Sequence, residues 1–459
     1  MAGAKTTMEW LGRARDAPGP RYAAILAALS HAVREGELHP GDRLPPQRAA
    51  ADYLGVDLTT VTRAYSLARE QGLLEGEVGR GSFVRAPSRE DEAGLVDLSM
   101  NLPPPPSGVS LGEMLRRTTD SILLRSDPAI LMAYHPGFGT RGQRAAGAQW
   151  LAPTLGALDP ERILVCPGAQ TALAAVVATL CRPGDAIVVD PLTYPGLIGI
   201  ARNARIRLIA CPADDDGMRP DELERLCAAE KPRAIYLIPA MQNPTAVTMS
   251  RARRIEVAAI AEAVGAWIIE DDPYSRLMSA PPPALAALAP ERTFHVATLA
   301  KCLSPGLRIA YLACPAYWSD KIADALRSIA MMPAPLMAAI ATRWIQEGQA
   351  DTLLAAIRAE ARARRAIADI LLPQAQGGSE SIHVWLPLSS GSASERLRLS
   401  GQRSGLAIVT AESFAAHADH PNGARISLGG PGRRSVLEGA LQALSRLIAT
   451  SAEPLRPMA

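Results

Sequence analysis

The sequence lacks the features that mark secreted, membrane and metal-binding proteins. Its six cysteines, spread over 459 residues, have neither disulfide nor metal-ligand spacing, which indicates a reducing compartment. The chain contains no signal peptide and no run of about 18 or more uninterrupted apolar residues. Internal repeats are absent as well. We therefore expect a cytoplasmic protein that binds no metal and does not enter a membrane.

A strong charge of one sign is also missing. The formal net charge is +2, from 48 Lys plus Arg and 46 Asp plus Glu, and says little about partners. The 48% hydrophobic composition is sufficient for large cores, and the length fits a small domain plus a two-lobed one. Ala-rich stretches such as 355–368 alternate with Arg and Glu, a pattern that predicts surface helices.

The most informative stretch runs from Glu270 to Arg308. Two apolar runs, 266–269 and 294–297, are expected to be strands that carry polar groups to their ends, where open α/β sheets bind ligands. Lys301 follows the second run, and lysine is rarely buried without a partner. A pyridoxal phosphate site explains this position, because the lysine amine would condense with the cofactor aldehyde to form an internal aldimine.

Neighbouring side chains complete this hypothesis. Asp271 would pair with the pyridine nitrogen and keep it protonated, and Tyr274 would donate a hydrogen bond to the ring hydroxyl oxygen. Arg308 would bind the phosphate, and Thr298 would add a hydroxyl to it. A salt-bridged loop cluster is the alternative, and it is the better explanation for any one of these residues alone. Together they favour the cofactor site.

The order Asp-x-Pro-Tyr, Thr-x-x-Lys and Pro-Gly-Leu-Arg resembles the fold-type I aminotransferases. The segment that begins at Tyr134 resembles the one whose tyrosine reaches the phosphate of the neighbouring subunit's cofactor, which implies a homodimer. Pro167 to Thr171 would place the backbone N–H groups of Ala169 and Gln170 at a helix N-terminus, which binds phosphate.

The same resemblance assigns roles to three further residues. Tyr194 would stack on the ring face, and Asn243 would be the second partner of the ring hydroxyl oxygen. Arg425 would bind the α-carboxylate of a substrate. Two positions depart from the family pattern, because Ala300 stands in place of the usual serine and Ala246 in place of the usual glycine. These departures leave cofactor binding better supported than turnover.

The expected strands of this part alternate with helical stretches. They predict a large lobe, about 130–330, built on a mostly parallel seven-stranded α/β sheet. A smaller α+β lobe follows, about 333–459, with strands at 381–386, 406–409 and 424–428, and an N-terminal arm from Val96 joins it. The strands expected for the large sheet are 163–166, 186–189, 207–210, 234–238, 266–269, 294–297 and 309–313.

An aminotransferase does not require the first 85 residues, which have their own organisation. Apolar spacing predicts helices at 22–33 and 47–53, and a third from Asp57, an N-cap, to about residue 71. Two short strands, 73–77 and 82–85, follow around a tight turn. This order describes a winged helix-turn-helix, whose recognition helix enters the major groove of DNA.

The motifs of this segment, such as Leu44-Pro-Pro-Gln-Arg48 and Gly79-Arg-Gly-Ser-Phe-Val84, resemble those of the GntR regulators. An oligomerising helical domain is the alternative, because residues 1–85 hold 11 Lys plus Arg against 10 Asp plus Glu. Binding would therefore depend on local clusters of basic groups. The residues predicted to contact DNA are Arg48, Thr59, Thr60, Arg63, Arg80 and Gly81.

The sequence thus predicts a DNA-binding head at 1–85, a linker at 86–95 and an aminotransferase-like body at 96–459. This arrangement resembles the MocR subfamily of GntR regulators, which implies a pyridoxal phosphate-binding transcriptional regulator that senses an amine or amino acid through an external aldimine. The alternative is an active aminotransferase, similar to those acting on aminoadipate or kynurenine-like substrates. Asn243 and the Asp271-x-Pro-Tyr274 turn favour the enzyme, whereas Ala300 and the intact head favour the regulator.

Overall fold

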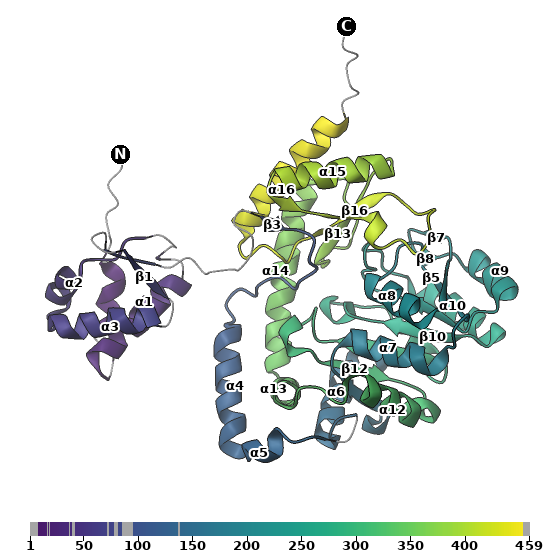
Figure 1. Ribbon diagram of the computed structural model, residues 1–459, viewed down its shortest axis with the longest axis horizontal. Coiled ribbons are helices and arrows are strands. Elements are labelled where there is room, and N and C mark those ends of the chain that lie inside the picture. Colours follow the sequence, from purple (N-terminus) through teal and green to yellow (C-terminus); the bar gives the residue numbers. More distant parts are fainter. Residues whose placement is uncertain are drawn as a thin grey trace, which may run out of the picture. The chain divides into compact units, whose positions relative to one another are not determined.

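The computed structural model describes residues 8–15, 17, 19–35, 37–38, 42–70, 73–77, 81–84, 95–135 and 138–452. The chain divides into two compact units, 1–94 and 95–459 (Figure 1). The division falls within the expected linker, most of which lies outside the described residues. No helix in the described part of the chain is long and apolar enough to cross a membrane.

The first unit consists of three helices and a hairpin. The helices are α1 (Arg21–Arg34), α2 (Gln47–Leu54) and α3 (Leu58–Glu70), and the antiparallel strands are β1 (Leu74–Glu77) and β2 (Gly81–Val84). Their bounds differ by only one or two residues from the predicted ones. A short 3-10 helix, η1 (Glu9–Ala14), was not predicted, and it packs on α1 with Trp10 and Leu11 buried.

Helix α3 follows the predicted pattern closely. Val61, Ala64, Tyr65 and Ala68 are all buried in the core of this unit. At the start of the helix, the carboxylate of Asp57 accepts a hydrogen bond from the backbone N–H of Thr59 at 2.8 Å, as expected of an N-cap. The winged helix-turn-helix architecture is therefore present.

The second unit is built on the predicted seven-stranded sheet. Its order is β4-β12-β11-β10-β9-β5-β6, and all neighbours run parallel except β12, which is antiparallel to β11 and β4. The strands are β4 (Ile163–Cys166), β5 (Ala186–Val189), β6 (Arg207–Ala210), β9 (Ala234–Leu237), β10 (Trp267–Asp271), β11 (Thr293–Thr298) and β12 (Ala310–Ala313).

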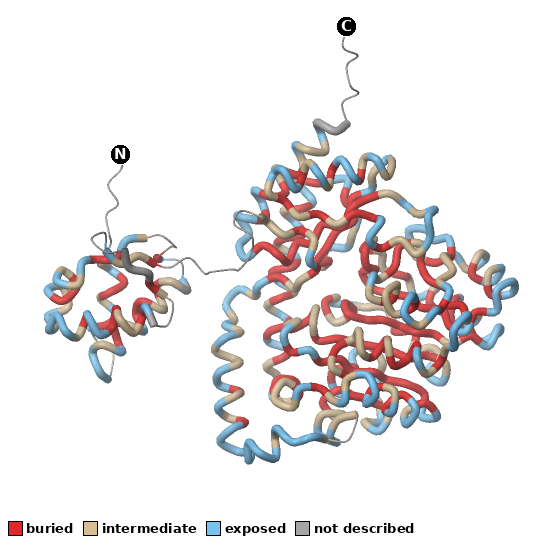
Figure 2. Tube along the Cα trace, viewed as in Figure 1, coloured by how far each residue is buried: buried red, intermediate tan, exposed pale blue. Residues whose placement is uncertain are grey.

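Helices cover both faces of this sheet. Successive residues of a strand point to opposite faces, and each face belongs to a different hydrophobic core. Ile187 and Val189 belong to one core, and Val188 belongs to the other. The strands are buried almost throughout (Figure 2). The surrounding helices are α4 (Leu111–Arg125), α5 (Pro128–Leu131), α6 (Arg141–Leu155), α7 (Ala169–Leu180), α8 (Pro195–Ala204), α9 (Pro220–Glu230), α10 (Arg251–Val264), α11 (Leu285–Leu288), α12 (Ser319–Ala330) and α13 (Pro335–Gln346).

The smaller lobe contains a three-stranded antiparallel sheet, β13-β16-β15, formed by β13 (His383–Pro387), β15 (Val409–Thr410) and β16 (Gly423–Ser427). The strand predicted at 406–409 is divided in two. Its first part, β14 (Leu406–Ala407), pairs in parallel with β3 (Val96–Asp97) of the N-terminal arm. Helices α15 (Gly391–Arg403) and α16 (Arg434–Ala452) pack together beside these strands.

The two lobes meet within the long helix α14 (Gln349–Leu371). Its residues up to Ala361 belong to the core of the large lobe, and those from Ala368 belong to the core of the small lobe. The lobe change predicted near residue 333 therefore falls later, because α13 packs into the large lobe through Ile340 and Trp344.

The prediction of a surface helix at 355–368 is wrong for one face of α14. Glu360 and Arg364 are buried there and form an ion pair at 2.7 Å. Arg434 adds a second contact to Glu360 at 2.6 Å, and Arg364 donates to the carbonyl oxygen of Leu428 at 2.9 Å. Charged residues are buried here because each one is paired.

Candidate functional site

One cavity of about 310 Å³ lies at the carboxyl ends of the sheet strands. Asp271 ends β10, Thr298 ends β11, and Lys301 follows it, as expected for an open α/β sheet. Ten of the eleven site residues predicted for the body line this cavity. They are Ala169, Gln170, Tyr194, Asn243, Asp271, Tyr274, Thr298, Lys301, Arg308 and Arg425.

The amine of Lys301 is prepared for nucleophilic attack. Burial, reinforced by the positive charge of Arg425, lowers the pKa of Lys301 to about 8. The neutral amine is therefore more populated near neutral pH than in an exposed lysine. Its Nζ donates a hydrogen bond at 2.6 Å to the backbone oxygen of Asn101, a residue of the N-terminal arm.

Asp271 is buried and has one oxygen without a partner. Its Oδ2 accepts a hydrogen bond from the Tyr236 hydroxyl at 2.7 Å, whereas its Oδ1 has no partner among the described residues. Burial raises the pKa of Asp271 to about 7. A protonated pyridine nitrogen would satisfy Oδ1 and stabilise the carboxylate, so these residues fit pyridoxal phosphate.

The start of α7 lies beside the guanidinium of Arg308. Gly168 precedes this helix with φ of +92° and supplies no side-chain cap, so the first backbone N–H groups, including those of Ala169 and Gln170, have no capping side chain. A Cβ at Gly168 would come within 2.6 Å of the guanidinium of Arg308. The absence of a side chain therefore allows Arg308 to lie over the helix N-terminus.

The hydroxyl of Thr298 makes contacts within its own loop. Its hydroxyl oxygen accepts a hydrogen bond from the backbone N–H of Ala300 at 3.2 Å and lies 3.5 Å from the carbonyl oxygen of Ile309. Its side chain thus stabilises the loop that carries Lys301, and a phosphate contact would be additional. Ala300 also lines the cavity and has no hydroxyl to offer there.

A series of hydrogen bonds links Tyr274, which lines the cavity, to Asn101 and His383. The amide nitrogen of Asn101 donates to the Tyr274 hydroxyl at 2.9 Å and lies 3.2 Å from Nδ1 of His383. Nε2 of His383 lies 3.1 Å from the carbonyl oxygen of Gln242, so it carries the ring proton. Burial lowers the pKa of His383 to about 3, which keeps the ring neutral. The proton of Tyr274 is left for an acceptor in the cavity.

Arg425, on β16, reaches the same cavity from the small lobe. It donates to Oδ1 of Asn243 at 2.7 Å and to the backbone oxygen of Ser99. Its guanidinium lies 5.0 Å from the ring centre of Phe414, and its Nε has no partner among the described residues. The guanidinium can therefore accommodate a further acceptor, such as a carboxylate.

The two predicted tyrosines occupy different environments. Tyr194 is half-buried in the cavity wall, and burial raises its pKa. Tyr134 is 82% exposed and does not line the cavity. An exposed position is consistent with a role in the site of a neighbouring subunit. Ala246 has φ of +59°, a value that favours glycine, which explains the glycine of the family turn.

Sequence reasoning missed several residues that shape this cavity. Asn101, Tyr236 and His383 are buried and connect the predicted residues to one another, and Phe414 lies beside Arg425. Asn101 belongs to the arm that begins at Val96, which the sequence identified without giving Asn101 a role. Nothing in the sequence distinguished Tyr236 or His383 from ordinary core residues of their strands.

The head presents most of its predicted DNA-contacting residues at the surface. Arg48, Thr59 and Arg63 are exposed, Thr60 is half-buried, and Gly81 is exposed at the start of β2. Arg63 lies over the ring of Tyr22, 4.1 Å from its centre. The Thr59 hydroxyl donates a hydrogen bond to Asp57 at 2.6 Å, so part of its hydrogen-bonding capacity is used within the helix cap.

Arg80 lies outside the described residues. Arg43 is a candidate DNA contact that sequence reasoning missed. A Cβ at Gly81 would lie 3.2 Å from its guanidinium, so this exposed arginine lies against the β1–β2 hairpin. Arg43 also forms an isolated bridge with Phe83.

Two family models match the chain. "Aminotransferase class I and II" matches residues 95–430, and "Bacterial regulatory proteins, gntR family" matches residues 21–84. The HTH-type transcriptional regulator YdeF of Bacillus subtilis is 32% identical over 96% of this chain and 97% of its own length. The probable rhizopine catabolism regulatory protein MocR of Rhizobium meliloti is 28% identical over 75% of each chain.

Solved aminotransferases share the fold of the body. The α-aminoadipate aminotransferase LysN of Thermus thermophilus, complexed with N-(5'-phosphopyridoxyl)-L-leucine, superimposes with a TM-score of 0.71 and 25% identity. The match covers 78% of this chain and 93% of that one. Because a GntR-type head precedes a class I and II aminotransferase body whose cofactor is pyridoxal phosphate, the chain belongs to the MocR subfamily of GntR transcriptional regulators.

Proposed function

We propose that this protein is a cytoplasmic regulator that binds DNA with its head and senses a small amine or amino acid with its pyridoxal phosphate-loaded body. The main support is that Lys301 and Arg425 both donate hydrogen bonds to backbone oxygens of the N-terminal arm, at Asn101 and Ser99. The arm follows directly on the segment that leads to the DNA-binding head. A carboxylate that binds Arg425 therefore competes with the arm, as the cofactor does at Lys301.

Pyridoxal phosphate, when bound, supplies an aldehyde for an amine and an electron-withdrawing ring. Lys301 provides the amine that holds it, and Asp271 keeps its pyridine nitrogen protonated. Arg308 and the N-terminus of α7 bind the phosphate, helped by the hydroxyl of Thr298.

The remaining cavity residues position the ring. Tyr274 would donate its free proton to the ring hydroxyl oxygen, and the amide of Asn243 would contact the same oxygen. Tyr194 would pack against the ring face. Tyr134 would reach the phosphate in the partner subunit. These roles are supported by the position of the first three residues in one cavity and by the exposure of Tyr134.

The effector is held at two points. Its neutral amine would take the place of Lys301 at the cofactor and release the lysine amine, and its carboxylate would bind the guanidinium of Arg425 in place of the Ser99 oxygen. Release of Arg425 from the Ser99 oxygen is the differential contact that the effector needs in order to shift an equilibrium between two states, because Lys301 is already engaged by the cofactor.

The arm is suited to transmit this change because it is attached to the small lobe. β3 pairs with β14, and the backbone N–H of Ser427 donates to the Leu98 oxygen at 2.8 Å. A Cβ at Gly429 would approach the backbone oxygen of Leu102 to 1.8 Å, so the arm lies directly on the backbone that follows β16. Movement of Arg425 and β16 therefore moves the arm and the linker beyond it.

Effector screening tests this function. Amino acids and amines added to the pyridoxal phosphate-loaded protein are expected to raise its melting temperature, and the same compounds should change its affinity for its own upstream DNA in a mobility-shift assay. Arg425→Lys keeps the charge but loses the planar fork, so it should weaken the response to amino acids more than the response to amines without a carboxylate. Stabilising ligands that leave DNA affinity unchanged would contradict the sensor function.

The second candidate function is an active aminotransferase. The hydrogen bond of Asn243 to Arg425 and the unpartnered Oδ1 of Asp271 favour it, because both arrangements suit a working site. Incubation with an amino donor and a keto acid separates the two functions. Formation of many product molecules per subunit would support the enzyme. A change in the cofactor spectrum that stops after one ligand has reacted per subunit would support the sensor.

A homodimer is proposed from the apolar surface around α4 and α5. Leu124, Ile130, Met132 and Tyr134 are 87%, 67%, 61% and 82% exposed in one short stretch of chain. Exposed apolar groups clustered in this way mark an interaction surface. A second copy of the chain is the expected partner, because the role proposed for Tyr134 requires one.

Leu124→Glu should therefore shift the protein from dimer to monomer in sedimentation velocity experiments, because a charge would be buried unpaired in the interface. Ile370 offers a matched control. It is 79% exposed on α14, away from this stretch of sequence, and Ile370→Glu should remain dimeric. Equal sedimentation of both variants and the unmodified protein would place the interface elsewhere.

A further inference from the structure

A second cavity, of about 200 Å³, lies where the two lobes of the body meet. Its walls come from the segment after β5, the segment after β9, the hairpin of β7 (Ala213–Asp214) and β8 (Gly217–Met218), and the small-lobe residues Gln376, Trp385 and Pro421. Most of its lining is apolar, as in pockets that hold small organic molecules. None of the roles proposed for the cofactor site involves it.

The charge of this cavity is negative. Asp190 directly follows β5, is only 7% exposed, and has Gln242 as its polar neighbour. Burial raises the pKa of Asp190 to about 7, since no cation near it offsets the loss of water. None of the described residues that line the cavity is Lys or Arg. The buried carboxylate therefore lacks a counter-ion.

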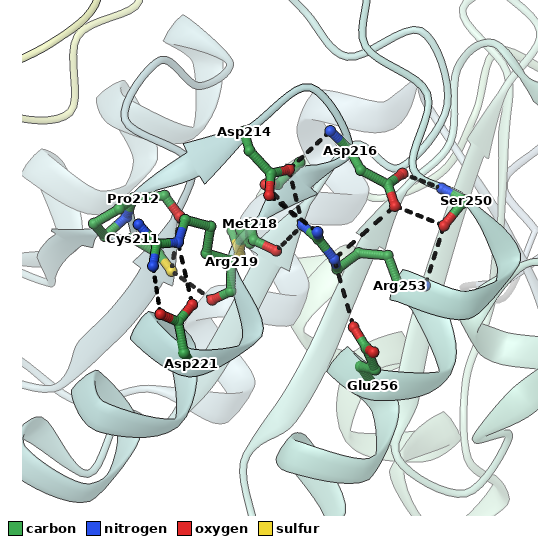
Figure 3. A network of polar contacts seen from close by, with 11 residues as sticks. Cys211, Pro212, Asp214, Asp216, Met218, Arg219, Asp221, Ser250, Arg253 and Glu256 are labelled. Carbon is green, nitrogen blue, oxygen red and sulfur yellow. Dashed lines mark hydrogen bonds and ion pairs between the residues drawn. The ribbon is translucent and has the colours of Figure 1, made fainter.

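The hairpin carries three carboxylates, of which Asp214 and Asp216 are paired and Asp215 is exposed where it lines the cavity. Asp214 receives two hydrogen bonds from the guanidinium of Arg253, both at 3.0 Å, and Asp216 accepts from the backbone N–H and the hydroxyl of Ser250, both at 2.6 Å (Figure 3). Arg253 also donates to the backbone oxygen of Met218 at 2.8 Å. This network braces the hairpin as a wall of the cavity, and it leaves Asp190 as the buried carboxylate in need of a cation.

Trp385 supplies an aromatic wall. It lies on β13, is 3% exposed and packs with Leu192 and Phe414. The face of an indole ring attracts cations, and its apolar surface accepts an alkyl chain. Leu192, Val247 and Met249 extend the apolar lining.

We propose that this cavity is a second ligand site, which binds a small primary alkylammonium ion with Asp190 as its counter-ion and the ring of Trp385 against its alkyl chain. The site binds its ligand without covalent chemistry. It therefore does not rest on the sensing proposed at Lys301.

The two cavities share a wall. Ile238 lines both, and Gln242, the partner of Asp190, accepts through its backbone oxygen the hydrogen bond from Nε2 of His383. His383 in turn contacts Asn101, which holds Tyr274 and Lys301. Gln242, the neighbour of Asp190, is thus two hydrogen bonds away from Asn101 of the arm.

Calorimetric titration with n-pentylamine tests the site. The full-length protein is first reduced with borohydride, so that the cofactor is fixed to its lysine and no longer reacts with amines. We expect saturable binding of pentylammonium, and binding of 1-pentanol and of pentanoate weaker by about tenfold or more, because a buried carboxylate prefers a charged donor and repels an anion.

Asp190→Asn keeps the size of the side chain and a partner for Gln242, and it should weaken pentylammonium binding about tenfold or more. Val247 is a half-buried residue of the cavity wall, and Val247→Phe narrows the cavity. This variant should also weaken pentylammonium binding, although it leaves the carboxylate in place. Asp320→Asn, in the first turn of α12, removes the same charge outside the cavity and should bind as the unmodified protein does. Unchanged affinity in Asp190→Asn or in Val247→Phe, equal binding of pentanol, or no binding of pentylamine would each overturn the proposal.

Discussion

Lys301→Ala should abolish the visible absorption of protein-bound pyridoxal phosphate, together with any ligand-dependent change in DNA affinity. The loss follows because the alanine cannot condense with the aldehyde, while the remaining contacts to phosphate and ring are non-covalent. Basal DNA binding should persist, since the head is a separate compact unit. An unchanged visible spectrum in the variant would refute the cofactor role of Lys301.

The chain offers an unusually clear control for this experiment. It contains four lysines, at positions 5, 231, 301 and 321. After borohydride reduction and proteolysis, mass spectrometry should find the cofactor on the peptide that contains Lys301. Lys321→Ala, which removes a lysine at the surface of α12, should leave the spectrum unchanged. Cofactor attached to Lys231 or Lys321 would show that the pKa of about 8 at Lys301 does not select the reactive amine.

The positions of the strands and the cofactor pocket were accessible from the sequence because they depend on local patterns. Each strand of the large sheet is a short, largely apolar run, and the runs of β10 and β11 end in polar groups that their parallel pairing brings to one edge. Asp271, Thr298 and Lys301 therefore met in one cavity, as predicted. The helices of the head were predictable for a similar reason, because an apolar stripe and an Asp57 cap define α3 locally.

Contacts between distant segments could not be predicted in the same way. Asn101 lies 173 residues from Tyr274 and 282 from His383, and nothing in the local pattern of any of them indicates the partner. The split of the strand at 406–409 has the same cause, because its first half pairs with the arm. Arg364 looked like a surface residue because Leu428 and Pro431, whose backbone oxygens it binds, become its neighbours only after folding.

Removing the guanidinium of Arg63 should greatly weaken binding to the protein's own upstream DNA. Arg63 is exposed on the first half of α3, the helix expected to enter the major groove, and it is held over the ring of Tyr22. A lost arginine contact to a base costs about 1–3 kcal/mol. Because a dimer carries two heads, Arg63→Ala should lower affinity by roughly 30-fold to 10⁴-fold in a mobility-shift titration.

Tyr22 and Arg69 provide the controls that separate a groove contact from a general loss of positive charge. Tyr22→Phe keeps the ring under Arg63 and should bind normally, whereas Tyr22→Leu removes the ring and should give an intermediate loss. Arg69→Ala removes the same charge near the end of α3, where Arg69 donates to the Tyr65 oxygen, and should have a small effect. If Arg63→Ala and Arg69→Ala weaken binding equally, and both reduce its salt dependence, Arg63 contacts phosphate and the DNA sequence is read by other residues of the head.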